Sequence, residues 1–220
     1  MSYKVIVTGA TGMVGEGVMH ECLQDPEISE VLIINRRPSG FSHPKLKEVI
    51  HQDFFNFSHV PVDFRNYNAC FFCLGVSSVG MSKADYEKQT YQLTMEVART
   101  MAAQNPQMTF CYVTGAGTDS SEKGRSHWAR VKGKTENDLL KLPFKQAFMF
   151  RPAYMRTTPG LKNTKKYYKF IEFLEPALRL FFPNYVSSLS EVGQAMIKAM
   201  KKGYHRQILE VPDIKALSKA

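Results

Sequence analysis

The feature that most constrains the fold is a glycine-rich segment close to the N-terminus. A short β-branched run, YKVIVTG (3–9), leads into GATGMVG, which places glycine at positions 9, 12 and 15, and a helical repeat of apolar residues follows over 11–25. Glycines at this spacing between a strand and a helix permit a tight turn and a close backbone approach to a pyrophosphate, which the helix N-terminus attracts. We therefore predict a dinucleotide-binding loop, the alternative being glycines that only turn the chain.

The rest of the chain alternates apolar runs with helical repeats, with strands expected at 30–35, 46–53, 67–75, 108–115 and 146–152 and a long helix at 82–104. Such alternation indicates parallel strands joined by right-handed crossovers. We predict one α/β domain over residues 1–220, a doubly wound parallel sheet of the Rossmann type with strand order 3-2-1-4-5-6. The pattern changes past Arg151, and residues 151–205 are expected to form a small cap at the C-terminal side of the sheet.

Composition and charge narrow the classes of partner. Hydrophobic residues make up 44% of the chain and charged residues 22%, as in an ordinary globular protein. The net charge of +9 suits an anionic ligand, but no nucleic-acid motif is visible, so we predict no nucleic-acid partner. No apolar run is long enough to span a membrane and no signal peptide is visible, which makes a cytoplasmic location the expectation. Cys70 and Cys73 form a CxxC inside an apolar run and are expected to be buried thiols, so no metal site is predicted.

The end of the second predicted strand bears on the choice of nucleotide. It reads Asn35-Arg36-Arg37, with no acidic residue. In Rossmann folds an acidic side chain here binds the ribose 2′-hydroxyl of NAD, whereas an arginine accommodates the 2′-phosphate of NADP. The guanidinium fork matches phosphate geometry. We predict NADP(H) as the cofactor, with NAD as the alternative. A second alternative is that the two arginines bind no cofactor and only form an exposed turn before Pro38.

Several motifs together resemble the atypical short-chain dehydrogenase/reductase superfamily, and most closely its Tat-interacting-protein-like branch. They read VTGATGMVG, NRR, HQDF, CLGVSS, YVTGAG, VKGKTENDL and FRPAYM. The resemblance covers nearly the whole chain, most specifically residues 3–160, and the segment from Lys132 to Glu136 is the part most particular to the branch. It implies an NAD(P)-binding oxidoreductase acting on a carbonyl-type substrate.

The resemblance also implies site residues. Asp53 occupies the position that holds the adenine amine, although it could equally cap a turn. Thr114 matches the catalytic serine or threonine, although its hydroxyl could instead satisfy a nearby backbone group. Lys132 matches the lysine that binds the nicotinamide ribose. The cofactor contacts expected in full are Gly9, Thr11, Gly12, Met13, Val14, Gly15, Arg36, Arg37, Asp53, Phe54, Leu74, Gly75, Lys132 and Arg151.

One position departs from the family pattern. The tyrosine that transfers the proton is replaced by Trp128, one helical turn before Lys132. An indole N–H donates a hydrogen bond but does not give up its proton in the physiological range. His127 and Tyr154 are the alternative donors, although His127 is rotated about 100° from Trp128 on a helix. Tyr112 shares a strand face with Thr114 but is expected to lie deeper. The predicted catalytic residues are Thr114, Lys132 and Tyr154.

Three functions compete at this point. The first is an NADP(H)-dependent oxidoreductase with a non-standard proton donor, or none, acting on a small molecule. The second is a regulatory binding protein that senses whether NADPH is bound. The third is a peripheral membrane role for the basic aromatic segment 161–186, which we expect instead to cover a substrate pocket. Analogy with the family adds a homodimer formed through helix 82–104.

Overall fold

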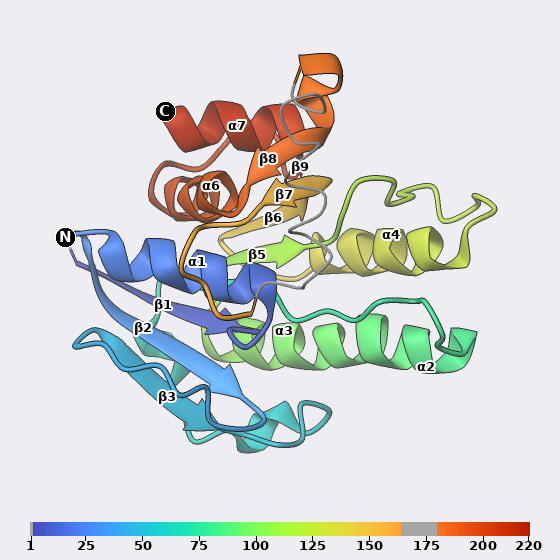
Figure 1. Ribbon diagram of the computed structural model, residues 1–220. Helices are drawn as coiled ribbons and strands as arrows, with labels where there is room; N and C mark the ends of the chain where they lie inside the picture. The colour runs from blue at the N-terminus through green and yellow to red at the C-terminus, as the bar shows by residue number, and fades with distance from the viewer. Residues whose placement is uncertain (1, 164–179) are drawn as a thin grey trace.

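The protein is described by a computed structural model over residues 2–163 and 180–220, and its centre is a seven-stranded parallel sheet (Figure 1). The strand order is β3-β2-β1-β4-β5-β6-β9, so the predicted order 3-2-1-4-5-6 is confirmed and β9 extends it beside β6. The strands are β1 Tyr3–Thr8, β2 Ile28–Asn35, β3 Leu46–Ile50, β4 Ala69–Phe72, β5 Thr109–Val113, β6 Gln146–Arg151 and β9 Ile208–Glu210.

Helices cover both faces of the sheet (Figure 1). They are α1 Met13–Gln24, α2 Lys83–Glu87, α3 Leu93–Gln104, α4 His127–Leu139, α6 Leu189–Lys202 and α7 Val211–Lys219. The predicted helix 82–104 is present as α2 and α3, joined by a π-helical turn at Lys88–Gln92. Ser82 caps its start, because the Ser82 side chain accepts a hydrogen bond from the backbone of Asp85 at 3.1 Å.

The core forms because successive side chains of a strand point to opposite faces. Val5 and Val7 of β1 are fully buried against the layer that contains α1 and α6, whereas Ile6 is buried against the layer that contains α3. Both faces of the central strands are therefore apolar, as expected for a parallel sheet covered by helices.

Part of the region expected to form a small cap, residues 151–205, packs into the main fold. Helix α6 packs on α1 so closely that a Cβ on Gly17 would lie 2.9 Å from Leu189, and one on Gly193 would lie 2.7 Å from Glu21. Strand β9 joins the main sheet. Helical and strand periodicity cannot say which layer an element joins, and here α6 and β9 complete the Rossmann fold. Among the described residues, β7, Tyr154–Arg156, and β8, Val186–Ser188, form a separate two-stranded parallel sheet.

The structure bears on the predictions about the cysteines and about membrane-spanning segments. Cys70 is buried in β4 and Cys73 follows that strand, and both are free thiols whose pKa is raised by burial. Among the described residues, none of the helices has the length and apolar character needed to cross a membrane. Most of the basic aromatic segment, residues 164–179, lies outside the described residues, so its predicted role stays a prediction.

Candidate functional site

The glycine loop is built so tightly that side chains are excluded from it. Gly9 has φ +73°, and a Cβ there would lie 2.8 Å from the backbone of Cys73 and Leu74. A Cβ on Gly15 would lie 2.2 Å from the Gly9 carbonyl oxygen. The Gly12 N–H donates to that oxygen at 2.9 Å, and Gly12 is the N-cap of α1. The loop thus brings the ends of β1 and β4 against the start of α1 and leaves room for a pyrophosphate but not for side chains.

A cavity of about 420 Å³ opens beside this loop, at the carboxyl ends of β1, β2 and β4. Five predicted cofactor residues line it together with Asn35, which the sequence marked only as part of the tripeptide with the arginines. Arg36 and Arg37 are both exposed, and neither forms an ion pair within residues 2–163 and 180–220. The lining residues are Gly9, Thr11, Asn35, Arg36, Arg37 and Leu74.

The strand-end turn behind the arginines is held by one carboxylate. Glu48 of β3 accepts hydrogen bonds from the Asn35 side chain and from the Ser39 backbone, both at 2.9 Å. Asn35, which stands where an acidic residue would bind a ribose hydroxyl, is 4% exposed and donates its amide away to Glu48. The exposed positive charge at this end of the cavity therefore comes from the two arginines.

The remaining predicted nucleotide contacts lie around this cavity rather than in its lining. Met13 and Val14 begin α1 and pack partly against the core. Asp53 is exposed, and its carboxylate accepts from the Phe55 N–H at 3.0 Å, which is the turn role left open by the sequence. Phe54 is 2% exposed, with its ring 5.3 Å from that of a neighbouring phenylalanine, so its side chain belongs to the core. Gly12, Gly15 and Gly75 contribute backbone only.

The second half of the site lies between β5, β6 and α4. Trp128 and Lys132 share one face of α4, with the Lys132 Nζ 5.9 Å from the centroid of the indole ring. The far edge of the indole would lie 3.3 Å from a Cβ on Gly117, so Trp128 packs on the loop that follows β5. The His127 ring instead lies 6.3 Å from that of Tyr86. The predicted divergence of His127 from Trp128 is confirmed.

Thr114, at the end of β5, directs its hydroxyl inward. Its Oγ1 lies 2.6 Å from a carboxylate oxygen of Glu136 and 3.1 Å from the backbone oxygen of Phe150. A hydroxyl has one proton to donate, so in this arrangement Thr114 can accept a hydrogen bond from a ligand but cannot donate one. The Thr114 carbonyl oxygen accepts from the Lys132 Nζ at 2.6 Å. Burial lowers the pKa of Lys132, and attraction to Glu136 opposes that effect.

Arg151 does not extend toward a cofactor as the resemblance implied. Glu136 is fully buried, and the Nε and Nη2 atoms of Arg151 bind its two carboxylate oxygens. The same guanidinium donates to Glu210 at 3.1 Å and to the Ser120 hydroxyl at 2.5 Å. A buried carboxylate requires a paired cation, which explains why this arginine is held within the protein. The sequence singled out the segment from Lys132 to Glu136, but it could not show that Glu136 binds an arginine on β6.

Two tyrosines remain to be located: Tyr112, which was expected to lie deep in the sheet, and Tyr154, the alternative proton donor. Tyr112 is 2% exposed in β5, burial raises its pKa, and its ring lies 5.8 Å from that of Phe72. The expectation that it lies deep in the sheet is confirmed. Tyr154 begins β7, and its hydroxyl is buried.

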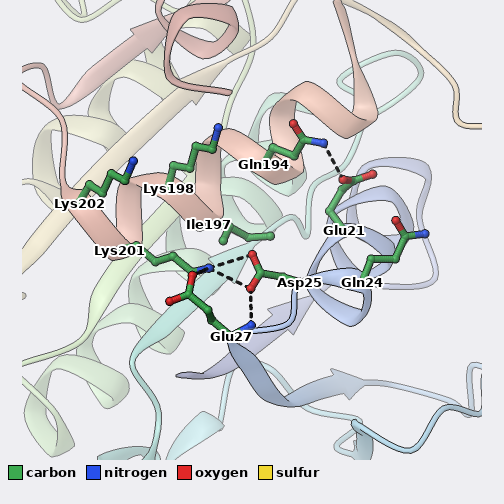
Figure 2. Close-up of a pocket in the computed structure, with 9 residues that line it drawn as sticks. All are labelled: Glu21, Gln24, Asp25, Glu27, Gln194, Ile197, Lys198, Lys201 and Lys202. Carbon is green, nitrogen blue, oxygen red and sulfur yellow. Dashed lines mark hydrogen bonds and ion pairs between the residues drawn. The ribbon is translucent and has the colours of Figure 1, made fainter. Parts of the chain in front are cut away.

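A second cavity, of about 440 Å³, lies at the other end of α1, between that helix and α6 (Figure 2). Several of its side chains bind one another: Lys201 donates to Asp25 at 2.9 Å and to Glu27 at 2.6 Å, and Gln194 donates to Glu21 at 3.1 Å. These contacts close the groove between the two helices and explain their packing, so the cavity beside the glycine loop is the candidate site. The lining residues are Glu21, Gln24, Asp25, Glu27, Gln194, Ile197, Lys198, Lys201 and Lys202.

A doubly wound sheet with this loop at its first turn defines a dinucleotide-binding protein of the short-chain dehydrogenase/reductase type. The chain belongs to the NAD dependent epimerase/dehydratase family, whose sequence model matches residues 5–129. Among solved structures, the enzyme WbmG of Bordetella bronchiseptica, in complex with NAD, covers the whole chain with a TM-score of 0.67 and 11% identity, over 78% of its own length. At that identity the likeness concerns the fold.

Two curated relatives match over most of the chain. Leucinostatins biosynthesis cluster protein T of Purpureocillium lilacinum is 24% identical over 178 residues, 79% of this chain, and the FMP52 protein of Saccharomyces cerevisiae is 26% identical over 149 residues, 67% of this chain. The matches span 64% and 63% of those proteins, slightly under two thirds of their length. The expectation of a cytoplasmic location is contradicted, because the FMP52 relatives are named as mitochondrial proteins.

Proposed function

We propose that this chain binds NADP(H) and acts as an oxidoreductase on a small carbonyl or alcohol substrate. The observation that carries the cofactor proposal is the position of Arg36 and Arg37. Both arginines line the cavity that the glycine loop also lines, and neither forms an ion pair within the described residues. This position supports binding of a 2′-phosphate by the two arginines and of the pyrophosphate by the loop. The names of the FMP52 relatives support a mitochondrial location, which subcellular fractionation tests.

The residues expected near the nicotinamide support a slow carbonyl reduction. A bound nicotinamide supplies hydride transfer, and the protein has to hold the substrate and manage one proton. Lys132 supplies a positive charge beside Thr114, and Trp128 fills the place of the family tyrosine without its acidity. Positioned acid–base catalysis is worth about 10²–10⁴-fold, so turnover well below that of a tyrosine-containing reductase is expected.

A second candidate function is a regulatory protein that senses NADPH occupancy. The inward hydroxyl of Thr114 favours it, because a reductase of this family needs that group to donate to the substrate oxygen. A homodimer through α2 and α3 and the absence of a nucleic-acid partner stay proposals as well.

The cofactor experiment compares NADPH and NADH binding by thermal shift. A ligand at 100 times its dissociation constant adds about 2.7 kcal/mol of stability, which is readily measured. Charge-assisted hydrogen bonds contribute about 1.5–3 kcal/mol, so the double variant Arg36→Ala/Arg37→Ala should lose about 10- to 100-fold in NADPH affinity and little in NADH affinity. Arg65→Ala is the matched control, because Arg65 is exposed and precedes the N-terminal end of β4, whereas the cavity lies at the carboxyl end. NADH binding as tight as NADPH binding would refute the arginine argument.

Turnover separates the two candidate functions. The protein is incubated with NADPH and a panel of aldehydes, ketones and quinones, and cofactor oxidation is followed by absorbance. A slow substrate-dependent rate supports the oxidoreductase. Tight NADPH binding without any rate favours the sensor, for which a change in partner binding on NADPH addition is the next measurement.

A further inference from the structure

Lys132 is a titratable side chain on the face of α4 that carries Trp128. Its Nζ lies 5.9 Å from the indole centroid and donates to the Thr114 carbonyl at 2.6 Å. It also lies 3.7 Å from the position of a Cβ on Gly115, so it reaches the loop after β5. An ammonium has three N–H groups, and the contact with Thr114 engages one of them. Two remain for groups that enter from the loop side.

Within the described part of the chain, few charges face Lys132. From its own helix Glu136 faces it, but that carboxylate is bound by Arg151 of β6, which also binds Glu210 at the end of β9. From β5 the contact is the backbone oxygen of Thr114, which does not titrate. Burial lowers the pKa of Lys132, with attraction to Glu136 opposing it, so the ammonium gives up its proton nearer to neutrality than an exposed lysine does.

We infer that the ammonium of Lys132 is the proton donor that takes the place of the family tyrosine. The inference rests on the proposed function. In reduction, the carbonyl carbon gains a hydride from a dihydronicotinamide, the C=O π pair moves to the oxygen, and that oxygen takes an N–H proton from Lys132. The products are the alcohol, the oxidised nicotinamide and a neutral amine, which regains its proton from water. Alcohol oxidation runs through the same atoms in reverse.

The first test needs neither substrate nor cofactor. Trp128 is the single tryptophan of the chain, so its fluorescence reports the charge on the neighbouring lysine. Titrating the free protein with base should change the emission with an inflection below the ordinary lysine value of about 10.4. Lys132→Met should abolish the inflection, whereas Lys134→Met, whose Nζ lies over Tyr91 of another helix, should keep it. An inflection that survives in Lys132→Met, or none in the wild type, overturns the inference.

The second test separates this inference from the function on which it rests. Lys132→Arg keeps a positive charge and hydrogen-bond donors but does not release a proton, because arginine stays protonated. We expect its NADPH affinity to stay within about threefold of wild type, while single-turnover NADPH oxidation falls by about 10²-fold or more. The wild-type rate should decline above the pH of the fluorescence inflection. A Lys132→Arg rate equal to wild type refutes the donor role alone, whereas wild-type protein without NADPH binding refutes the proposed function and the donor role together.

Discussion

The ion pair between Glu136 and Arg151 gives a prediction whose size follows from burial. The Glu136 side chain is fully buried and that of Arg151 is 10% exposed, so neither charge can turn to water when its partner is removed. Removing one member of such a pair costs about 3–5 kcal/mol, because the other is left buried and unpaired. Glu136→Gln keeps the shape and one acceptor for Thr114 but loses the charge that Arg151 binds. We expect the free energy of unfolding to fall by about 3–5 kcal/mol.

The assay is urea unfolding followed by circular dichroism, together with a thermal melt. For a chain of this size each kcal/mol lowers Tm by roughly 2–4 °C, so a fall of about 6–20 °C is expected. Lys141→Met is the control, because the Lys141 side chain that pairs with Asp138 is 73% exposed, and exposed ion pairs contribute little to stability. The double variant Glu136→Leu/Arg151→Met should be more stable than Glu136→Gln, since it leaves no unpaired charge. A loss below about 1 kcal/mol for Glu136→Gln would refute the reasoning.

Three further predictions concern the loop, the acid limb of stability and the proton donor. Gly9→Ala should abolish NADPH binding in a titration, because the new Cβ meets the backbone after β4 at 2.8 Å and φ is +73°. Burial alone would raise the pKa of Glu30, but hydrogen bonds from Lys47 and Tyr67 hold it below its usual value. Its contribution to stability is therefore present above the unfolded-state pKa, about 4.3, and is lost as the pH falls through the lower folded value. Urea melts from pH 3 to 6 should show a shallower acid loss for Glu30→Gln. Trp128→Tyr should raise the rate of NADPH oxidation with carbonyl substrates because it adds the family's phenol donor, and an unchanged rate would count against the tryptophan as the cause of slow turnover.

The fold followed from local patterns because each pattern has one physical solution. Glycines 9, 12 and 15 between a strand and a helix need the backbone contacts that the structure has, and buried apolar runs alternating with helices leave one common topology. Strand β9 is only three residues long, and nothing in Ile208–Glu210 says which sheet it joins. Pairing with β6 is decided by tertiary contacts across more than fifty residues.

The sequence predicted the site residues whose role depends only on their place at a strand end. It did not predict those whose side chain is held by a residue on another element. Arg36 and Arg37 follow a strand end, and position alone placed them at the cavity. Arg151 belongs to the motif FRPAYM, yet its guanidinium binds Glu136, which lies fifteen residues away on a helix. The competition between a ligand and a buried carboxylate for one arginine depends on burial, which periodicity does not reveal.

Trp128 lies close to the loop after β5, and a substitution at Gly117 tests whether that contact matters. A Cβ on Gly117 would lie 3.3 Å from the far edge of the indole, a contact that a shorter phenol ring would not make, and its φ is +83°. Gly117→Ala should therefore cost the backbone strain of about 1–2 kcal/mol and also displace the indole. Gly80→Ala is the matched control, since Gly80 has φ +76° with open space around it, and it should show the strain without any change in Trp128 emission. If the indole contact matters, Gly117→Ala destabilises more than Gly80→Ala, and the excess disappears when Trp128→Tyr is added. Equal losses in both backgrounds would mean that the loop after β5 does not depend on the tryptophan.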